Sequence, residues 1–206
     1  MPRIRQHVNP LKSDLLEIAD VPRLAPPAGQ ALDVELGCAE AHFLVDLARA
    51  DRHTLFVGVE IRRELVTFTS RELARAGLAN VQLVFANMSV DMGRLFAPGS
   101  VRRFFLNFPD PWFKSRQHKR RVIGPELMTE IHRSLTPDGE LFVQTDIFEL
   151  ALDAMGALEG MAPARFVNAH EPWSFLPANP YAAKSRRERQ CEGEGARVWR
   201  LLYRRA

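Results

Sequence analysis

The chain has 206 residues, of which 46% are hydrophobic, and this suffices for one ordinary domain with a single core. Its formal net charge of +3 is mild for a nucleic-acid-binding protein, so the placement of the charges is more informative than their total. No apolar run approaches the roughly 20 residues that span a bilayer, and the first residues lack the apolar stretch of a secretory signal. We therefore expect a cytoplasmic protein without a membrane partner.

The N-terminal 30 residues are expected to form a basic extension, partly disordered, in which Arg3, Arg5 and Lys12 could serve as an RNA-binding arm. Residues 31–206 are expected to form a single domain. The two cysteines, Cys38 and Cys191, stand in no Cys/His cluster, so we expect two free thiols and no metal.

From residue 31 the chain alternates between short apolar runs typical of buried parallel strands and stretches with helical spacing. The expected strands are 31–36, 54–59, 81–85, 101–106 and 140–144, followed by two weaker ones at 165–168 and 198–203. The expected helices are 43–50, 63–76, 88–95, 125–135 and 148–158, with turns at Gly77 and 136–139. This alternation predicts an α/β fold with a doubly wound, mostly parallel, seven-stranded sheet.

Ligands of such sheets bind beyond the carboxyl ends of the strands, so the residues that follow each strand are candidates for a cofactor site. Gly37 leaves the first strand and would let the backbone approach a ligand closely, and Glu35 places a carboxylate near the same loop. Glu60 ends the second strand and could accept hydrogen bonds from the hydroxyls of a ribose. Asn87, after the third strand, could either bracket an adenine edge or cap a helix.

The loop after the first strand distinguishes between two kinds of cofactor. Positions 37–42 read Gly-Cys-Ala-Glu-Ala-His, which lacks the G-x-G-x-x-G of a dinucleotide site, and Glu40 would repel a pyrophosphate. S-adenosylmethionine has no phosphate and carries a sulfonium cation and an ammonium group, so an acidic loop favours it on Coulombic grounds. The sequence therefore favours the methyl donor over a nicotinamide dinucleotide.

The segment 107–121 is the most unusual in the chain. Two prolines flank Asp110 and stiffen the loop, a placement typical of a substrate-orienting group. The segment also carries five cations without an acid among them, interleaved with rings, and this combination favours RNA as a partner. The cations are Lys114, Arg116, Lys119, Arg120 and Arg121, and the rings are those of Trp112, Phe113 and His118.

Two further groups could contact a base. Asp146 follows the fifth strand and could accept hydrogen bonds from N1 and N2 of a guanine. Ser185 and Glu188 lie in a basic run that could accept from a base edge or from the amine of the cofactor, or could simply be a solvated charged segment.

Taken together, these residues resemble the tRNA (guanine-N7)-methyltransferase family, from about residue 30 to the C-terminus. The most specific match is Asn107-Phe108-Pro109-Asp110-Pro111-Trp112, followed by Lys114, His118, Lys119, Arg120 and Arg121. The resemblance implies a class I methyltransferase sheet whose last strand is antiparallel. It also implies transfer of a methyl group from S-adenosylmethionine to N7 of the variable-loop guanine, position 46, of tRNA by a monomer or homodimer.

The same resemblance implies roles for individual residues. Asp110 falls on the catalytic position, and the cofactor-binding residues are Glu35, Glu60, Asn87 and Asp110, which join Gly37. The substrate-binding residues are Lys114, Asp146, Ser185, Glu188, Arg120 and Arg121. Ala39 and Ala41 stand where the family usually has glycines, so cofactor binding would be weakened if these positions require a positive φ.

Three alternatives remain open at this point. The chain could be a methyltransferase for another substrate, which would not need the basic segment 112–121. It could be an RNA-binding protein that kept the fold but lost the cofactor, a hypothesis that rests on Ala39 and Ala41. A nicotinamide-dependent dehydrogenase is the third, and the missing glycines argue against it.

Overall fold

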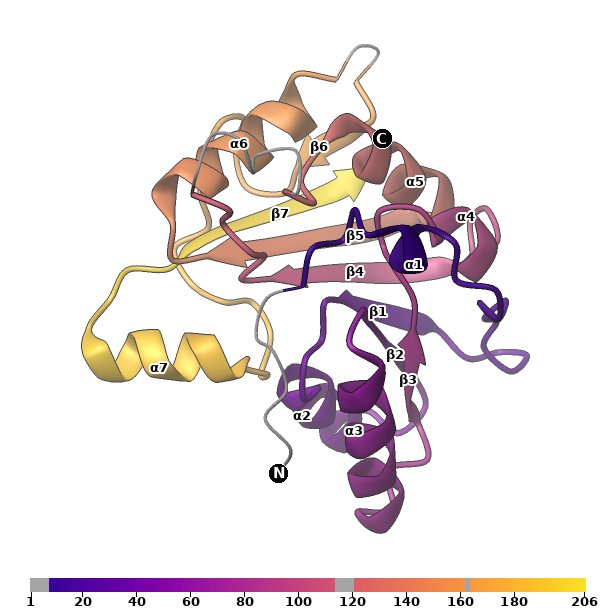
Figure 1. Cartoon of the computed structure of the whole chain (residues 1–206). Helices are drawn as coiled ribbons and strands as arrows, with labels where there is room; N and C mark the ends of the chain where they lie inside the picture. Colours follow the sequence, from indigo (N-terminus) through magenta and orange to yellow (C-terminus); the bar gives the residue numbers. More distant parts are fainter. Residues whose placement is uncertain (1–7, 114–120, 162–163) are drawn as a thin grey trace.

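The computed structural model describes residues 8–113, 121–161 and 164–206. It contains one seven-stranded sheet with helices on both faces (Figure 1). The strands are β1 (Leu32–Leu36), β2 (Leu55–Glu60), β3 (Val81–Phe85), β4 (Val101–Asn107), β5 (Leu135–Thr145), β6 (Phe166–Asn168) and β7 (Trp199–Arg205). The helices are α1 (Ser13–Leu16), α2 (His42–Ala50), α3 (Arg63–Arg75), α4 (Met92–Leu95), α5 (Pro125–Ser134), α6 (Phe148–Glu159) and α7 (Arg186–Glu194).

The strand order is β3-β2-β1-β4-β5-β7-β6, so the chain reverses direction across the sheet between β1 and β4. Strands β1 to β5 pair in parallel, whereas β7 is antiparallel to both β5 and β6. The predicted fold class is therefore confirmed. A cofactor site is expected beyond the carboxyl ends of β1 and β4, where the order reverses.

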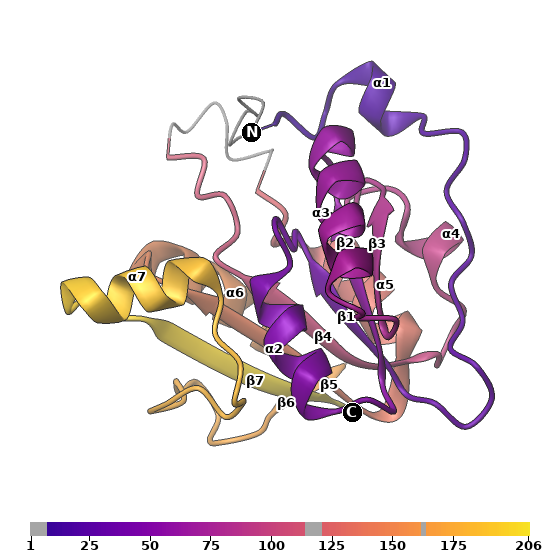
Figure 2. The same cartoon turned by 90° about the horizontal axis from the view of Figure 1, so that it is seen from below.

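The alternation of side chains along the strands produces two cores, one on each face of the sheet. Phe104 and Leu106 of β4 join a core with residues of α4, α5 and α6, whereas Phe105 between them joins a core with α2 and α3. Figure 2 shows α2 and α3 in the latter layer, seen from below the orientation of Figure 1. The helices thus cover both faces and leave the strand ends for ligands.

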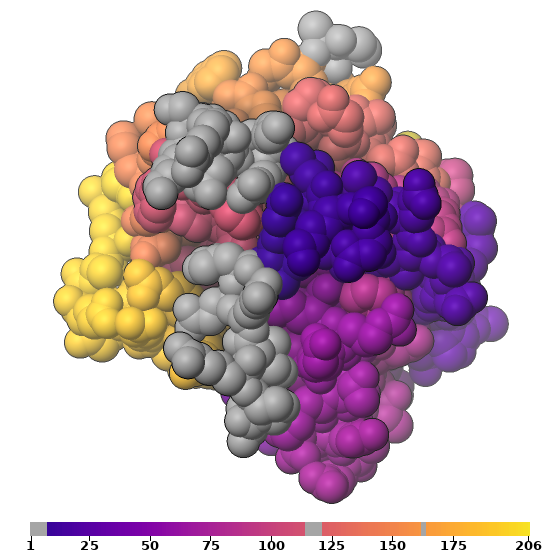
Figure 3. All heavy atoms as spheres, in the orientation of Figure 1, coloured from indigo at the N-terminus to yellow at the C-terminus, as the bar shows by residue number. Residues whose placement is uncertain are grey.

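The N-terminal segment from residue 8 onward lies along the domain. Ile18 and Leu24 are buried, and Leu24 forms an isolated parallel bridge with Phe96. The guanidinium of Arg94 donates to the carbonyl oxygen of Ile18 at 2.6 Å and to that of Ala19 at 2.7 Å. In Figure 3 this segment, drawn in indigo, covers part of the face shown. Arg3 and Arg5 of the predicted RNA-binding arm lie outside the described residues.

The described elements differ from the expected ones in four places. The helix expected over 88–95 is shorter, because only α4 is helical there. The turn expected at 136–139 is an irregularity within β5, where the pairing with β4 shifts register. Helices α1 and α7 were not expected. Within the parts of the chain that the structure describes, no helix is long and apolar enough to cross a membrane.

Candidate active site

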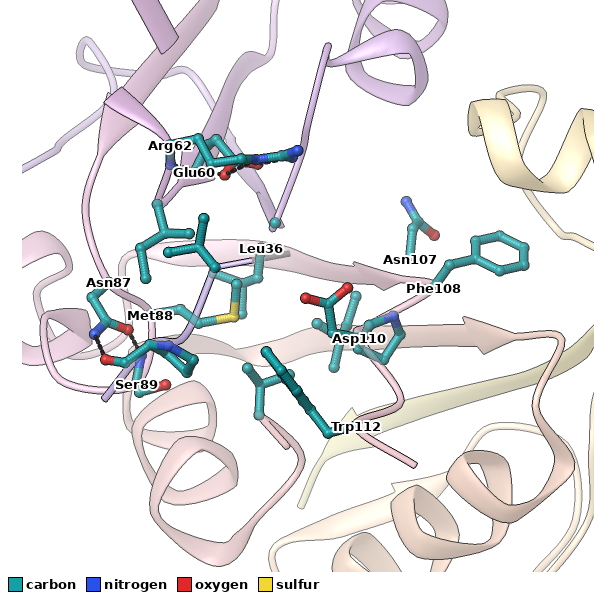
Figure 4. A pocket seen from close by; sticks show the side chains of 17 residues that line it. Leu36, Glu60, Arg62, Asn87, Met88, Ser89, Asn107, Phe108, Asp110 and Trp112 are labelled. Atoms are coloured by element: carbon teal, nitrogen blue, oxygen red, sulfur yellow. Dashed lines mark hydrogen bonds and ion pairs between the residues drawn. The ribbon is translucent and has the colours of Figure 1, made fainter. Parts of the chain in front are cut away.

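A cavity of about 700 Å³, counting its open mouth, lies at the carboxyl ends of β1, β2, β3 and β4. Four of the predicted residues line it, namely Gly37, Glu60, Asn87 and Asp110. Figure 4 shows Asn87 and Met88 on one side of the cavity, and Asp110 with the ring of Trp112 on another. The structure thus brings together residues that are up to 73 positions apart in the sequence, as a ligand site at the strand ends requires.

The loop after β1 is shaped by left-handed backbone. Gly37 has a φ of +77°, and Ala39 and Ala41 have φ values of +48° and +58°. The amides of Gly37 and Cys38 donate to the carbonyl oxygen of Val59, at 2.8 and 3.3 Å, which ties the loop to the end of β2. Both alanines therefore occupy the conformation that favours glycine, at a cost of about 1 kcal/mol each.

Glu35 lies beneath this loop in β1, with 3% of its surface exposed. Its Oε1 accepts a hydrogen bond from Nδ2 of Asn107 at 2.7 Å, whereas Oε2 is buried without a hydrogen-bond partner among the described residues. Loss of solvation raises the pKa of this carboxyl to about 8, against the hydrogen bond from Asn107, and the charge of Glu60 raises it further. Unlike its neighbours Leu36 and Gly37, Glu35 does not line the cavity.

Glu60 ends β2 with both carboxylate oxygens occupied. Oε1 accepts from Nε of Arg62 at 2.9 Å, and Oε2 accepts from the other guanidinium arm at 2.9 Å and from the amide of Ala39 at 3.1 Å. This salt bridge raises the pKa of Arg62, with burial opposing the effect. A ribose that binds to Glu60 must therefore share the carboxylate with Arg62 or displace it.

Asn87 connects the cavity to the N-terminal segment. Its Nδ2 donates to the carbonyl oxygens of Pro10 and Leu15, at 2.9 and 3.0 Å, and its Oδ1 accepts from the amide of Ser89 at 3.0 Å. Pro10 and Val8 themselves line the cavity. In this structure Asn87 fixes a wall of the cavity and caps a turn, and its own amide donates to Oδ2 of Asp91 at 2.8 Å.

The loop after β4 carries Asp110 between two residues with left-handed backbone, Phe108 (φ +49°) and Trp112 (φ +42°). The amide of Phe108 donates to the carbonyl oxygen of Gln144 at 2.7 Å, so the loop leaves the sheet beside β5. Nε of Arg121 donates to the carbonyl oxygen of Pro111 at 2.8 Å. The loop is held in a strained shape at both ends, which fits a rigidly placed carboxylate.

Arg121 has only 8% of its side chain exposed, and it forms salt bridges with Glu149 and Asp153 of α6. It anchors the loop to α6, so its guanidinium is not exposed as a phosphate-binding group would be. Lys114 and Arg120, together with Arg116, His118 and Lys119, lie outside the described residues.

Asp146 and the pair Ser185 and Glu188 meet around α7, and none of them lines the cavity. Asp146 accepts from Nε of Arg187 at 3.1 Å. Ser185 is the N-cap of α7, and its hydroxyl accepts from the amide of Glu188 at 3.1 Å. The Ser-x-x-Glu spacing thus forms a helix cap, and the fully buried Glu188 supports α7 from within the domain.

A buried polar row joins Glu35 to Glu188. Asn107 donates to Glu35, Nε2 of Gln144 donates to Oδ1 of Asn107 at 2.9 Å, and the same nitrogen donates to Oε2 of Glu188 at 3.0 Å. Arg200 completes the row by donating to Oε1 of Glu188 at 2.9 Å. The loop after β1 and the start of α7 are therefore linked through the sheet.

Sequence reasoning missed Asn107 and Gln144 as parts of the site, although both lie in segments that it singled out. The strand register would have indicated them, because Asn107 and Gln144 pair with each other at the carboxyl ends of β4 and β5. Cys38 and Cys191 are buried free thiols. Within 8–113, 121–161 and 164–206, no cluster of three or more His, Cys, Asp or Glu residues could hold a metal ion.

Comparisons with known proteins agree on the class of enzyme. A family model described as "Putative methyltransferase" matches residues 30–201. A tRNA (guanine-N(7)-)-methyltransferase of Synechococcus sp. (strain JA-2-3B'a(2-13)) is 38% identical, over 92% of this chain and 79% of that protein. Another of Synechocystis sp. (strain ATCC 27184 / PCC 6803 / Kazusa) is 36% identical, over 98% of this chain and 97% of that protein.

Solved structures share the fold at low sequence identity. An rRNA methylase from Streptococcus thermophilus superposes with a TM-score of 0.55 and 12% identity, over 85% of this chain and 87% of that one. A geranyl diphosphate C-methyltransferase from Streptomyces coelicolor A3(2), in complex with S-adenosyl-L-homocysteine, has a TM-score of 0.54 and 16% identity, over 86% of this chain and 75% of that one. These similarities concern the fold alone.

Proposed function

The chain belongs to the tRNA (guanine-N7)-methyltransferase family, and we propose that it methylates N7 of the variable-loop guanine, position 46, of tRNA. It is an S-adenosylmethionine-dependent methyltransferase, which sets aside the dehydrogenase hypothesis. The specific position in tRNA is our proposal, as are the roles of the individual residues below. We also propose that residues 31–206 form the methyltransferase domain and that the enzyme acts in the cytoplasm, where it would meet tRNA.

The cavity fits the methyl donor. The carboxylate of Glu60, which lines the cavity, suits ribose hydroxyls, and the buried carboxyl of Glu35, next in sequence to the lining residues Leu36 and Gly37, would offer an acceptor to an ammonium group. Leu36, Met88 and Leu106 supply an apolar lining. We propose that Gly37, Glu35, Glu60 and Asn87 hold the cofactor. When bound, S-adenosylmethionine supplies an electrophilic methyl group on a sulfonium cation.

Guanine N7 has a lone pair and carries no proton, so methyl transfer does not require a general base. The contribution of the protein is therefore placement and electrostatics. A methylated guanine is cationic and its N1 and N2 hydrogens are more acidic. We propose that the carboxylate of Asp110 accepts from this edge and so binds the transition state more tightly than the ground state.

The remaining proposed roles concern the RNA. Lys114 and Arg120 would contact phosphates, since their segment combines cations without acids. Asp146 accepts a hydrogen bond from Arg187, and it would bind a guanine only if this bond were replaced by hydrogen bonds from the edge of the base. For Arg121, Ser185 and Glu188 the contacts described above favour an indirect role, in which they position the Asp110 loop and α7 beside the RNA.

The observation that carries the proposal is the rigid Asp110 loop at the mouth of a cavity lined by Gly37 and Glu60. The test is methyl transfer from labelled S-adenosylmethionine to tRNA that lacks its own N7-methylguanine, followed by nucleoside analysis. We expect labelled N7-methylguanosine, and its loss when guanine 46 is replaced by adenine. Label that persists in the replaced tRNA would refute the proposed position.

A further inference from the structure

Three aromatic side chains form a partly exposed cluster on the β5 and β7 side of the cavity, and the roles assigned above do not use it. The ring centroids of Phe148 and Trp199 are 4.5 Å apart, those of Phe175 and Trp199 are 5.0 Å apart, and those of Phe148 and Phe175 are 6.3 Å apart. We call Phe148, Phe175 and Trp199 the aromatic platform. Phe148 is 47% exposed, whereas several other phenylalanines of the chain are fully buried in the core.

The platform carries a cation on one of its faces. Cζ of Arg197 lies 3.8 Å from the centroid of the Trp199 ring, and Arg197 is exposed. Arg200 of β7 is paired with Glu188 and Arg204 with Glu140, so Arg197 is the cation that the platform presents. A partly exposed ring surface that carries a guanidinium is an arrangement that binds unstacked nucleotides, since every base has a π-face and every nucleotide a phosphate.

The platform lies beside the reaction site. Trp199 pairs with Thr145 in β5, and the neighbouring Arg200 pairs with Gln144, which in turn pairs with the cavity-lining Asn107 of β4. Two inter-strand spacings separate β7 from β4, roughly 10 Å. Phe148 begins α6, two residues after Asp146. A short stretch of unstacked RNA could therefore reach from the cavity to the platform.

We propose that the aromatic platform receives an unstacked base of the tRNA next to the target guanine while that guanine occupies the cavity. This inference rests on the proposed function. The platform would fix the RNA backbone on the far side of Asp146 and thereby hold the target base in register with Asp110. Stacking tolerates every base, so the platform would contribute affinity and geometry, and little sequence preference.

The test compares ring-removing variants with a ring-preserving one. We expect Phe148→Ala and Trp199→Leu to raise the KM for tRNA about five- to 150-fold, the range expected when one base loses its stacking partner. The kcat at saturating tRNA and the Kd for S-adenosylmethionine should stay within about twofold, and Trp199→Phe should restore most of the affinity. Because Phe148 is half exposed, Phe148→Ala should fold even if a Trp199 variant does not.

Val167→Ala is the matched control. Val167 is an exposed apolar residue, 58% exposed, and it pairs with Arg204 at the other end of β7. Its loss should leave the KM for tRNA unchanged. A KM that is unaffected in Phe148→Ala and Trp199→Leu, or raised equally in Val167→Ala, would overturn the proposal. So would a change in the sedimentation coefficient of Phe148→Ala without RNA, which would make the patch a protein interface.

A direct measurement separates this inference from the proposed function. A tRNA with 2-aminopurine beside guanine 46 should lose fluorescence on binding to the wild-type protein, and lose less on binding to Trp199→Leu. If wild-type protein transfers no methyl group to tRNA, the proposed function fails whatever the platform does. If it transfers the methyl group and the quenching is equal in both proteins, only the platform proposal fails.

Discussion

The unusual carboxyl of Glu35 predicts a pH dependence that can be measured without any ligand. The pKa of this carboxyl is raised from 4.5 to about 8 in the folded chain, mainly by burial. A carboxyl with a raised pKa is held neutral by the fold, so its contribution to the free energy of unfolding is largest below pH 4.5 and is lost as pH rises toward 8. The loss is about 1.4 kcal/mol per pH unit, or roughly 3 kcal/mol between pH 5.5 and 7.5.

Glu35→Gln removes the titrating group and keeps an oxygen that can accept from Asn107. Urea titrations of the cofactor-free proteins measure the free energy of unfolding of the variant and of the wild type. We expect the variant's value minus the wild-type value to increase by roughly 3 kcal/mol as the pH rises from 5.5 to 7.5. Glu149→Gln removes an exposed carboxylate, 59% exposed, and should follow the wild-type curve. Parallel curves for wild type and Glu35→Gln would refute the reasoning, because the buried carboxyl would then be ionised at no cost.

Three further predictions concern the cavity. Ala39→Gly should raise the free energy of unfolding by about 0.5 kcal/mol and tighten S-adenosylmethionine binding, since Ala39 has a positive φ and is half-buried. The control Ala50→Gly, at the end of α2, should destabilise the protein. Denaturation and calorimetric titration check both variants, and a loss of stability in Ala39→Gly would count against strain at this position. Asp110→Ala should lower kcat about a hundredfold or more and change the Kd for the cofactor less than about threefold; equal losses in both would contradict its transition-state role. Arg62→Met should tighten cofactor binding about fivefold, because the Glu60 carboxylate becomes available to the ribose. The control Arg63→Met should leave cofactor affinity unchanged. Weaker binding in titrations of Arg62→Met would show that the guanidinium helps to hold the ligand.

The parallel part of the fold could be predicted because its signals are local. Each of β1 to β4 is a short run with mostly apolar residues, and the expected ranges differ from the observed ones by at most one residue at an end. The helix α7 was missed for the opposite reason. Its sequence, RRERQCEGE, has Cys191 as its only hydrophobic residue and therefore no apolar period. Its start was nevertheless signalled by Ser185 and Glu188, whose spacing was interpreted as a substrate contact.

The candidate site was predictable residue by residue but not in its internal contacts. Motif positions after the strands identified Gly37, Glu60, Asn87 and Asp110, which all line the cavity. The engagement of Glu60 by Arg62 could not be predicted, because it depends on the side-chain rotamer of an arginine in a loop. The anchoring of Asn87 to Pro10 could not be predicted either, because it joins residues 77 positions apart and depends on the path of the N-terminal segment.

The buried row from Glu35 to Glu188 also makes the protein sensitive to hydrolysis of two side-chain amides. The side-chain nitrogen of Asn107 donates to Glu35, and that of Gln144 donates to both Asn107 and Glu188, so the row depends on both side chains remaining amides. Asparagine and glutamine are thermolabile, and hydrolysis turns an amide into an acid of nearly the same shape. At Gln144 this would set a new carboxylate against Glu188 in a site without solvent to separate the charges. Hydrolysis of this one amide would therefore destabilise the hydrogen-bonded link between the loop after β1 and the start of α7.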